Sequence, residues 1–116
     1  MQASPIRIGV IGFDGVNGID LAGPVEVFAN AGELDREAGE ARRYEIVILG
    51  LTRKAFTTDS GMVIQPRRTL ADAPRLDTLI VPGGTGLRAP RTQAAIAAWL
   101  RERGRDIRRV CSVCTG

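Results

Sequence analysis

The sequence predicts an α/β fold in which a mostly parallel sheet is covered by helices on both faces. Two observations lead to this prediction. Short apolar runs alternate with helical apolar patterns along the chain, and the main runs are nearly continuous, as in strands buried on both faces. Alternating strands and helices favour parallel pairing, and sheets of this kind bind ligands at the carboxyl ends of their strands.

The first strand is predicted from the apolar run over residues 6–13, which lies between Pro5 and Asp14. Its near-continuity indicates burial on both faces and a central place in the sheet. A turn over residues 15–18 separates this strand from a predicted helix. The apolar residues of that helix fall on one stripe, formed by Leu21, Val25, Phe28 and Ala29. Gly32 is the expected end of the helix.

A polar stretch over residues 33–43 leads to a second predicted strand at residues 44–49, which ends at Gly50. The pattern then weakens. Residues 57–61 have the composition of a turn, and residues 62–64 form a short apolar run before Pro66. We therefore expect a small hairpin or an edge piece in this part of the chain.

The last third of the chain repeats the strand and helix alternation. Residues 76–81 predict a third main strand, stopped by the glycine-rich loop at residues 82–86. Pro90 is expected to begin a helix with Ile96, Trp99 and Leu100 on one face, and Gly104 to close it, in line with the preference of helices for an initial proline and a final glycine. Residues 107–113 then predict a fourth main strand.

Length and composition limit the classes of function. The chain has 116 residues, which suits one domain, and a net charge of +3 from 16 basic and 13 acidic residues that are interleaved along it. Without a clustered basic patch, and with only 4% aromatic residues, nucleic-acid binding by this segment is disfavoured. The segments between strands carry neither a phosphate-binding loop nor a dinucleotide fingerprint, so we expect no nucleotide cofactor.

The cysteines are too few for a metal site. Cys111 and Cys114 are the two cysteines and the chain has no histidine, so we expect no metal and no other cofactor. Residues three apart on one strand point to opposite faces, which disfavours a disulfide between these two. No leader or membrane-length apolar run opens the chain. We expect a cytoplasmic protein with reduced thiols and no membrane contact.

Candidate functional residues gather where the predicted strands end. Asp20 follows the first strand, Gly83 and Gly84 follow the third, and Cys114 follows the fourth. A sharp turn after a strand lifts a nucleophile above the sheet edge and supplies backbone N–H groups as anion donors. A carboxylate beside a thiolate would share a proton with it and titrate as a pair, which suits acid and base chemistry.

Each of these residues also has a structural interpretation. Gly83 and Gly84 are explained equally well by loop conformations that glycine alone tolerates. Asp20 precedes a helical stripe, where aspartate is a favoured N-cap. Cys114 could be an inert buried thiol, and Cys111, inside the strand, is expected to pack in the core.

Three motifs resemble one known superfamily. Residues 20–24 read D-L-A-G-P, residues 81–86 read V-P-G-G-T-G, and residues 112–116 read S-V-C-T-G. Together, and in this order, they look like the ThiJ/PfpI superfamily, whose members are related to class I glutamine amidotransferase domains. The resemblance implies a flavodoxin-like sheet. It covers nearly the whole chain, which would make residues 1–116 the N-terminal part of such a domain, ending at the nucleophile elbow.

The resemblance also implies roles for individual residues. Cys114 matches the elbow nucleophile, and Asp20 matches the acid that contacts it. The backbone N–H groups of Gly84 and Thr115 match the expected oxyanion donors, with Gly83 in the same loop. Family members usually carry a histidine beyond the elbow, and this chain has no histidine. The fold is therefore expected to be incomplete at its C-terminus, and the chain to be a piece of a longer polypeptide.

Two branches of the superfamily share these motifs. The stretch at residues 58–62, with those at 70–74 and 76–79, resembles the ligand-sensing N-terminal domains of AraC-type transcriptional regulators. Isonitrile hydratases, which convert isonitriles to N-substituted formamides through a cysteine nucleophile, are the alternative, and a stress-related member without a defined substrate is a third. The regulator branch implies a small-molecule ligand, a homodimer, and contact with DNA only through a domain outside these residues.

Overall fold

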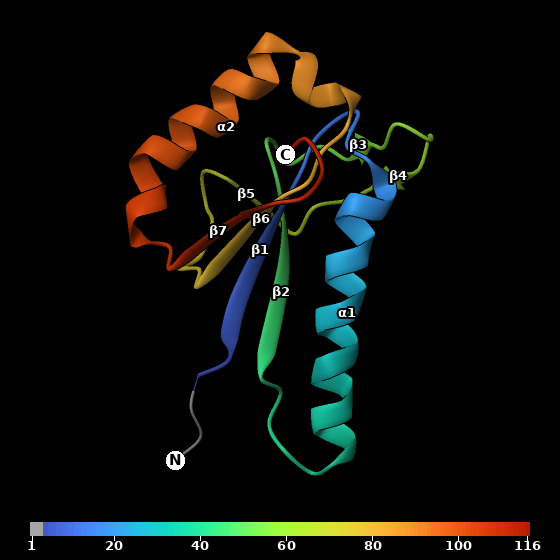
Figure 1. Ribbon diagram of the computed structural model, residues 1–116, viewed down its shortest axis with the longest axis vertical. Helices are drawn as coiled ribbons and strands as arrows, with labels where there is room; N and C mark the ends of the chain where they lie inside the picture. Colours follow the sequence, from blue (N-terminus) through green and yellow to red (C-terminus); the bar gives the residue numbers. More distant parts are fainter. Residues whose placement is uncertain (1–3) are drawn as a thin grey trace.

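The computed structural model describes residues 4–116 and places the first strand at the centre of a parallel sheet (Figure 1). The sheet has the order β5-β2-β1-β6-β7. Its strands are β1 (Ile6–Gly12), β2 (Tyr44–Gly50), β5 (Arg68–Thr69), β6 (Thr78–Val81) and β7 (Arg109–Ser112). Every neighbouring pair in this sheet is parallel. The predicted α/β class, the parallel pairing and the central position of the first strand are confirmed.

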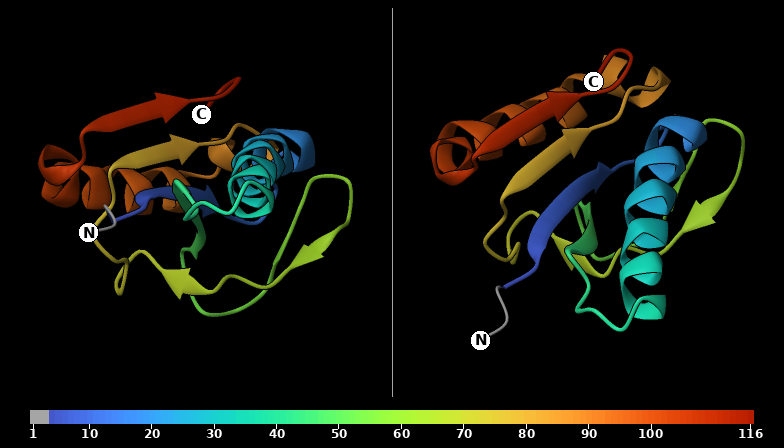
Figure 2. Two further views of the ribbon diagram at one scale, coloured as in Figure 1. Left: turned by 90° about the horizontal axis from the view of Figure 1, so that it is seen from below. Right: turned by 60° about the horizontal axis from the view of Figure 1, so that its bottom comes forward.

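Helices cover both faces of the sheet, as predicted (Figure 2). α1 (Gly18–Glu37) connects β1 to β2, whereas α2 (Pro90–Arg103) connects β6 to β7 on the other side of β1. Because parallel connections are right-handed, two crossovers that run in opposite directions from the centre place their helices on opposite faces. Short 3₁₀ turns, η1 (Thr85–Arg88) and η2 (Gly104–Asp106), flank α2.

The core lies between these layers. Val10, Ile11, Leu49 and Leu79 on the three central strands are completely buried. Alternate residues of one strand point to opposite faces, so the neighbours Val10 and Ile11 can both be buried only because each face has its own cover. That is the physical reason why the first strand reads as a nearly continuous apolar run.

The first helix continues past the glycine that was expected to end it. Gly32 is buried within α1, and a Cβ there would lie 3.7 Å from the Tyr44 carbonyl oxygen. That distance is an ordinary van der Waals contact, so Gly32 is simply an interior position of the helix, packed near the start of β2. Beyond it, Asp35 is buried, with 4% of its surface exposed, and accepts hydrogen bonds from the Arg43 backbone N–H and guanidinium. This polar anchor fixes the last turn of α1 against the loop before β2.

Replacement of Asp35 by alanine is expected to lower the melting temperature by on the order of 5 °C, because the Arg43 backbone N–H loses its acceptor. The hydrogen bonds from Arg43 hold the pKa of the Asp35 carboxyl below its usual value. A lowered pKa contributes stability above the unfolded-state pKa of about 4, and this contribution disappears as pH falls through the folded-state value. Thermal melts should therefore show a smaller difference between the two proteins below about pH 4 than at about pH 7. A difference of the same size at about pH 7 and pH 2 would contradict this assignment.

The predicted hairpin is present and docks on the loop after β1. β3 (Phe56–Thr57) pairs antiparallel with β4 (Val63–Ile64). Asp14 accepts a hydrogen bond from the Thr57 N–H at 2.9 Å, and the Gly15 N–H donates to the Thr57 carbonyl at 2.8 Å. These contacts bring the hairpin to the carboxyl end of the sheet.

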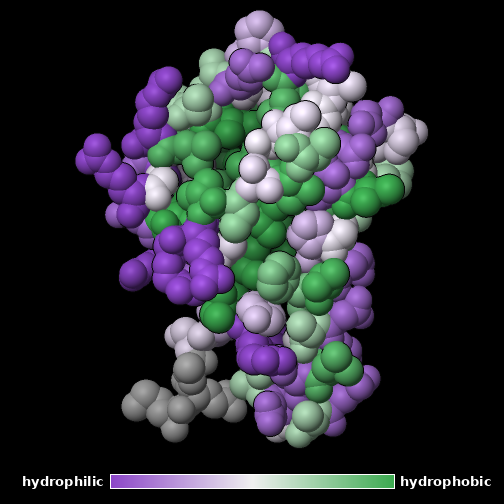
Figure 3. Space-filling view, viewed as in Figure 1, coloured by the Kyte–Doolittle hydropathy of each residue, from purple (hydrophilic) through white to green (hydrophobic). Residues whose placement is uncertain are grey.

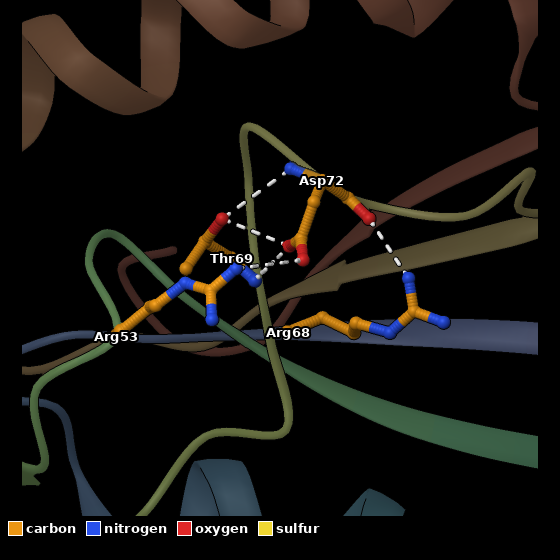
Figure 4. A network of polar contacts seen from close by, with 4 residues as sticks. All are labelled: Arg53, Arg68, Thr69 and Asp72. Atoms are coloured by element: carbon orange, nitrogen blue, oxygen red, sulfur yellow. Dashed lines mark hydrogen bonds and ion pairs between the residues drawn. The ribbon is translucent and has the colours of Figure 1, made fainter.

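The edge strand β5 and the loop after it were not predicted. Thr69 donates from its N–H and its hydroxyl to the Asp72 carboxylate, at 2.7 and 2.9 Å, and Arg68 donates to the Asp72 carbonyl (Figure 4). Arg53 lies on the other side of the same carboxylate, at 3.9 Å. The Thr69 hydrogen bonds lower the pKa of Asp72. This closed loop holds the Leu70 carbonyl where the Trp99 indole N–H donates to it at 2.8 Å.

The other edge strand, β7, is exposed along its whole length. Cys111 lies on this strand and is exposed, so the expectation that it packs in the core was wrong. The reason is the strand order, because β7 is an edge strand with β6 as its one neighbour in the sheet. An apolar groove of about 470 Å³ runs between α2 and β7, where Ile96, Leu100 and Val110 line it. Figure 3 shows the broad apolar surface on this part of the molecule.

Candidate functional site

The most unusual backbone conformation of the described residues is at Cys114. The Val113 N–H extends the pairing of β7 by donating to the Val81 carbonyl at 3.0 Å, and the Gly116 N–H then closes a tight turn onto the Val113 carbonyl. Cys114, inside this turn, has φ 58°, and among residues 4–116 it is the one non-glycine residue with positive φ. Strained residues of this kind occur at nucleophile elbows, where the turn exposes the side chain above the sheet. Cys114 is exposed here.

The loop after β6 lies directly beside this turn. A Cβ on Gly83 would come within 2.6 Å of the Thr115 hydroxyl and 3.0 Å of the Asp20 carboxylate. Gly84 has φ 135°, and a Cβ there would collide with the Gly15 carbonyl oxygen. Close backbone approach thus accounts for both glycines. Their role as anion donors stays a prediction.

The two predicted oxyanion donors differ in their hydrogen bonding. The Gly84 N–H donates to the Thr115 hydroxyl at 3.3 Å, so an incoming anion would have to displace that hydroxyl. The Thr115 N–H has no hydrogen-bond partner within residues 4–116. Sequence reasoning did not anticipate the hydroxyl contact, because it joins residues 31 positions apart.

Asp20 does not cap the helix. The N-cap of α1 is Asn17, whose side chain accepts the Asp20 N–H at 3.0 Å. Asp20 lies in the first turn, half-buried, and its carboxylate accepts the Gly83 N–H at 3.2 Å. Asn17 also donates its N–H to the Gly83 carbonyl at 2.8 Å. The start of α1 and the glycine loop are therefore joined by two hydrogen bonds, both to the backbone of Gly83.

A pocket of about 410 Å³ opens over the turn at Cys114, and Cys114 is part of its wall. Gly84 and Thr115 line it, together with the polar side chains of Asn17, Asp59, Arg88 and Gln93. Asp20 is not part of this wall; its carboxylate contacts the Gly83 N–H of the glycine loop. The predicted proton sharing between Asp20 and Cys114 therefore stays a prediction.

Four of these lining residues were not predicted. Asn17 could have been predicted as the N-cap of α1, since asparagine directly before a helical stripe is a preferred N-cap. Asp59 reaches the site because the Asp59 N–H donates to the Val16 carbonyl at 2.9 Å. Arg88 and Gln93 come from the turn and helix after the glycine loop. No local pattern reveals contacts of this range.

Within residues 4–116, no group of three or more His, Cys, Asp or Glu side chains could hold a metal ion. The same residues contain no helix that is long and apolar enough to cross a membrane. The candidate site consists of the thiol of Cys114, whose backbone has positive φ, together with backbone N–H groups and a few polar side chains.

A model of the DJ-1/PfpI family matches residues 6–116 of this chain. The chain belongs to the DJ-1/PfpI family. A solved structure of similar fold, a ThiJ/PfpI family protein from Pseudomonas syringae, superimposes with a TM-score of 0.79 at 27% identity, covering 97% of this chain and 43% of that one. The recognition of the superfamily from its three motifs is confirmed.

The names of the relatives of this DJ-1/PfpI domain include an uncharacterised protein, an enzyme and a transcriptional regulator. An uncharacterised protein from the cpoL 5' region of Streptomyces lividans is 32% identical over all of this chain and 78% of its own length. Isonitrile hydratase from Pseudomonas putida is 28% identical over 96% of this chain and 44% of its own length. The HTH-type transcriptional regulator GbdR from Pseudomonas aeruginosa is 32% identical over 97% of this chain and 29% of its own length. The DJ-1/PfpI domain therefore spans less than half of the two relatives named for an activity.

Proposed function

We propose that this DJ-1/PfpI domain is the ligand-sensing part of an AraC-type transcriptional regulator. The observation that carries the proposal is the open pocket over a strained Cys114, at the carboxyl edge of a parallel sheet. This edge is where ligands bind in such folds. The similarity to GbdR over 97% of the chain supports the regulator branch. In this proposal, DNA is contacted through a domain outside residues 1–116, in the cytoplasm, by a homodimer.

The pocket favours a small polar ligand. Its volume of about 410 Å³ is at the lower end of the range for small-molecule sites. Asp59 and Arg88 place opposite charges on its wall, and Asn17 and Gln93 add amide groups. A ligand of this kind would be held by directional hydrogen bonds, and the Cys114 thiol would contact it without turning it over.

An isonitrile hydratase-like enzyme is the second candidate, supported by the 28% identical relative and by the strain at Cys114. In this reaction the Cys114 thiolate adds to the terminal isonitrile carbon, and that carbon takes up a proton to give a thioimidate. Water then adds to the same carbon while the nitrogen is protonated, the hydroxyl proton is lost and the carbon–sulfur bond breaks, which returns the thiolate and releases an N-substituted formamide. Asp20 would relay the protons.

Turnover of cyclohexyl isocyanide distinguishes the two candidates. The protein is incubated with the isocyanide and formamide is measured by mass spectrometry, with Cys114→Ser as the control. The regulator proposal expects no formamide above the level of the control. Formamide production that needs Cys114 would overturn it in favour of the enzyme. Sequence-specific DNA binding by the complete gene product, measured by mobility shift on its own promoter region, is the positive test of the regulator.

Alkylation by iodoacetamide tests the candidate site in either case. We expect Cys114 to react on the order of tenfold faster than Cys111, because a turn of this kind after a strand presents its side chain to an open pocket, as at a nucleophile elbow. Both thiols are exposed, so Cys111 is a matched internal control. Peptide mass spectrometry over time gives the two rates. Equal rates, with Asp20→Asn also without effect, would show that the elbow does not activate the thiol.

A further inference from the structure

A charged cleft lies at the amino edge of the sheet, where the main strands begin. Two neighbouring cavities of about 560 and 420 Å³ form it, and both have Arg75 and Asp106 on their walls. We call this pair of cavities the amino-edge cleft. Its charged residues are Arg7, Arg75, Arg103 and Arg108, with the acids Glu45, Asp77 and Asp106.

The amino-edge cleft is separate from the pocket over Cys114. Arg7 is the second residue of β1, whereas Cys114 follows β7 at the opposite edge of the sheet. A strand of seven residues, such as β1, spans about 23 Å. A ligand in the cleft would therefore leave the candidate site at the carboxyl edge untouched.

Strand pairing brings arginines from the two ends of the chain to this edge. The Asp77 N–H donates to the Arg7 carbonyl at 2.9 Å, and the Arg109 N–H donates to the Asp77 carbonyl at 3.0 Å. Residues 101–109, which enter β7, contain five arginines and two acids. Figure 3 shows hydrophilic side chains gathered at the left of the molecule, where β6 and β7 begin in Figure 1.

Two of the three acids in the cleft are already engaged. Asp77 accepts the Thr78 hydroxyl at 2.6 Å on one oxygen and Arg108 Nε at 2.8 Å on the other. These two contacts hold the pKa of the Asp77 carboxyl below its usual value. Glu45 pairs with the Arg7 guanidinium at 3.4 Å. Their negative charges are therefore compensated within the chain.

The remaining charge of this edge is mainly positive. Within residues 4–116, no ion pair includes Arg75, Arg103, Arg105 or Arg109. Asp106 is the one acid on the cleft walls that is likewise outside these ion pairs. Four guanidinium groups thus face a single uncompensated carboxylate, an arrangement that attracts anions.

Arg7 also keeps hydrogen-bond donors that the chain does not use. Of its five N–H groups, one donates to the Arg75 carbonyl at 3.1 Å and one to Glu45 at 3.4 Å. Among the buried side-chain nitrogen and oxygen atoms of residues 4–116, Arg7 Nε is the one without a hydrogen-bond partner. Buried polar groups in native proteins are nearly always paired, with ordered water or an ion where protein groups are lacking.

We propose that the amino-edge cleft binds a polyvalent oxyanion, a small molecule that carries phosphate or carboxylate groups. The planar guanidinium fork matches both kinds of group and can bond them in a bidentate manner. Several separate guanidinium groups favour an anion with more than one charge. Because the arginines line cavities instead of a flat surface, the cleft suits a small molecule better than a macromolecule.

Calorimetric titration with inorganic pyrophosphate, and separately with citrate, tests this inference at constant ionic strength. We expect a Kd below about 1 mM for at least one of the two probes. Arg75→Gln should weaken binding at least about tenfold, because a charge-assisted hydrogen bond is lost. Arg75 is exposed, so the fold should survive, which circular dichroism checks.

Arg91→Gln is the matched control. Arg91 is also exposed and lies in the first turn of α2, away from the cleft at the other end of that helix. The variant loses the same charge, and its Kd should stay within about twofold of the parent because salt screens distant surface charges.

Nitrogen–proton correlation spectra locate the bound probe. Amide signals of residues 75–77 and 106–109 should shift on titration, whereas those of residues 114–116 should not. Binding of pyrophosphate alone would assign the ligand to phosphates, of citrate alone to carboxylates, and of both to their shared chemistry. The inference is overturned by no binding of either probe up to about 10 mM, by equal weakening in Arg75→Gln and Arg91→Gln, or by shifts confined to residues 114–116.

Discussion

Gly84→Ala is expected to lower the free energy of unfolding by about 3 kcal/mol or more, among the largest effects of any single substitution in this chain. Gly84 has φ 135°, a conformation that residues with a Cβ rarely adopt, and the added Cβ would meet the Gly15 carbonyl and, at 2.5 Å, the Asn17 nitrogen. The loop cannot move away without breaking the Asn17 contact to Gly83. Alkylation of Cys114 should change as well, because Gly84 lines the same pocket.

Gly23→Ala is the matched control for this prediction. Gly23 lies within α1 and a Cβ there meets nothing within 4 Å. Alanine should therefore raise the free energy of unfolding by about 0.5–1 kcal/mol, through the better helix propensity of alanine. Urea denaturation of both variants gives the comparison. If Gly84→Ala unfolds within about 0.5 kcal/mol of the parent, the close approach of the two loops is not as described.

Trp99→Ala is expected to lower the free energy of unfolding by about 3–5 kcal/mol. Trp99 is 8% exposed and joins α2 to the closed loop after β5 through the Leu70 carbonyl. Trp99→Phe keeps most of the packing but leaves that carbonyl without its donor, at a cost of about 1–3 kcal/mol. The difference in unfolding free energy between the two variants therefore separates the contribution of packing from that of the hydrogen bond.

Urea unfolding followed by circular dichroism measures both tryptophan variants, because Trp99 is the only tryptophan and its fluorescence is lost with it. Arg101→Ala, at an exposed position of the same helix, should change stability by less than about 0.5 kcal/mol. A Trp99→Phe variant as stable as the parent would show that the indole hydrogen bond contributes nothing net.

Elements with a local signal were predicted well. Pro90 begins α2 and Gly104 caps it, as the proline and glycine preferences indicate. The hairpin at β3 and β4 followed from its turn composition. The prediction that Gly32 ends the first helix was wrong, because glycine is also tolerated inside a helix, at a cost of about 0.5–1 kcal/mol. Arg43, eight residues after Asp35, decides that α1 continues, and no helix periodicity contains that contact.

The candidate site shows the same division. Gly83, Gly84 and Cys114 could be singled out because strand ends and glycine loops are readable, and because three motifs resembled one superfamily. Asn17 and Asp59 could not be assigned to the pocket in this way. Asn17 is placed there by its backbone hydrogen bond to Gly83. Asp59, in the hairpin, is placed there by its backbone hydrogen bond to Val16 in the loop after β1.

The sequence by itself determined the α/β class, the central strand, the family and the position of the tight turn at Cys114, because each depends on periodicity or on short motifs. Tertiary structure alone decided that Cys111 is exposed on an edge strand and that the Gly84 N–H donates to the Thr115 hydroxyl. It also decided which apolar side chains of α1, such as Ile19 and Val27, stay exposed. The physical reason is range. Local patterns record how a segment prefers to fold, whereas strand order and cross-loop hydrogen bonds join residues tens of positions apart and appear only when the chain has packed.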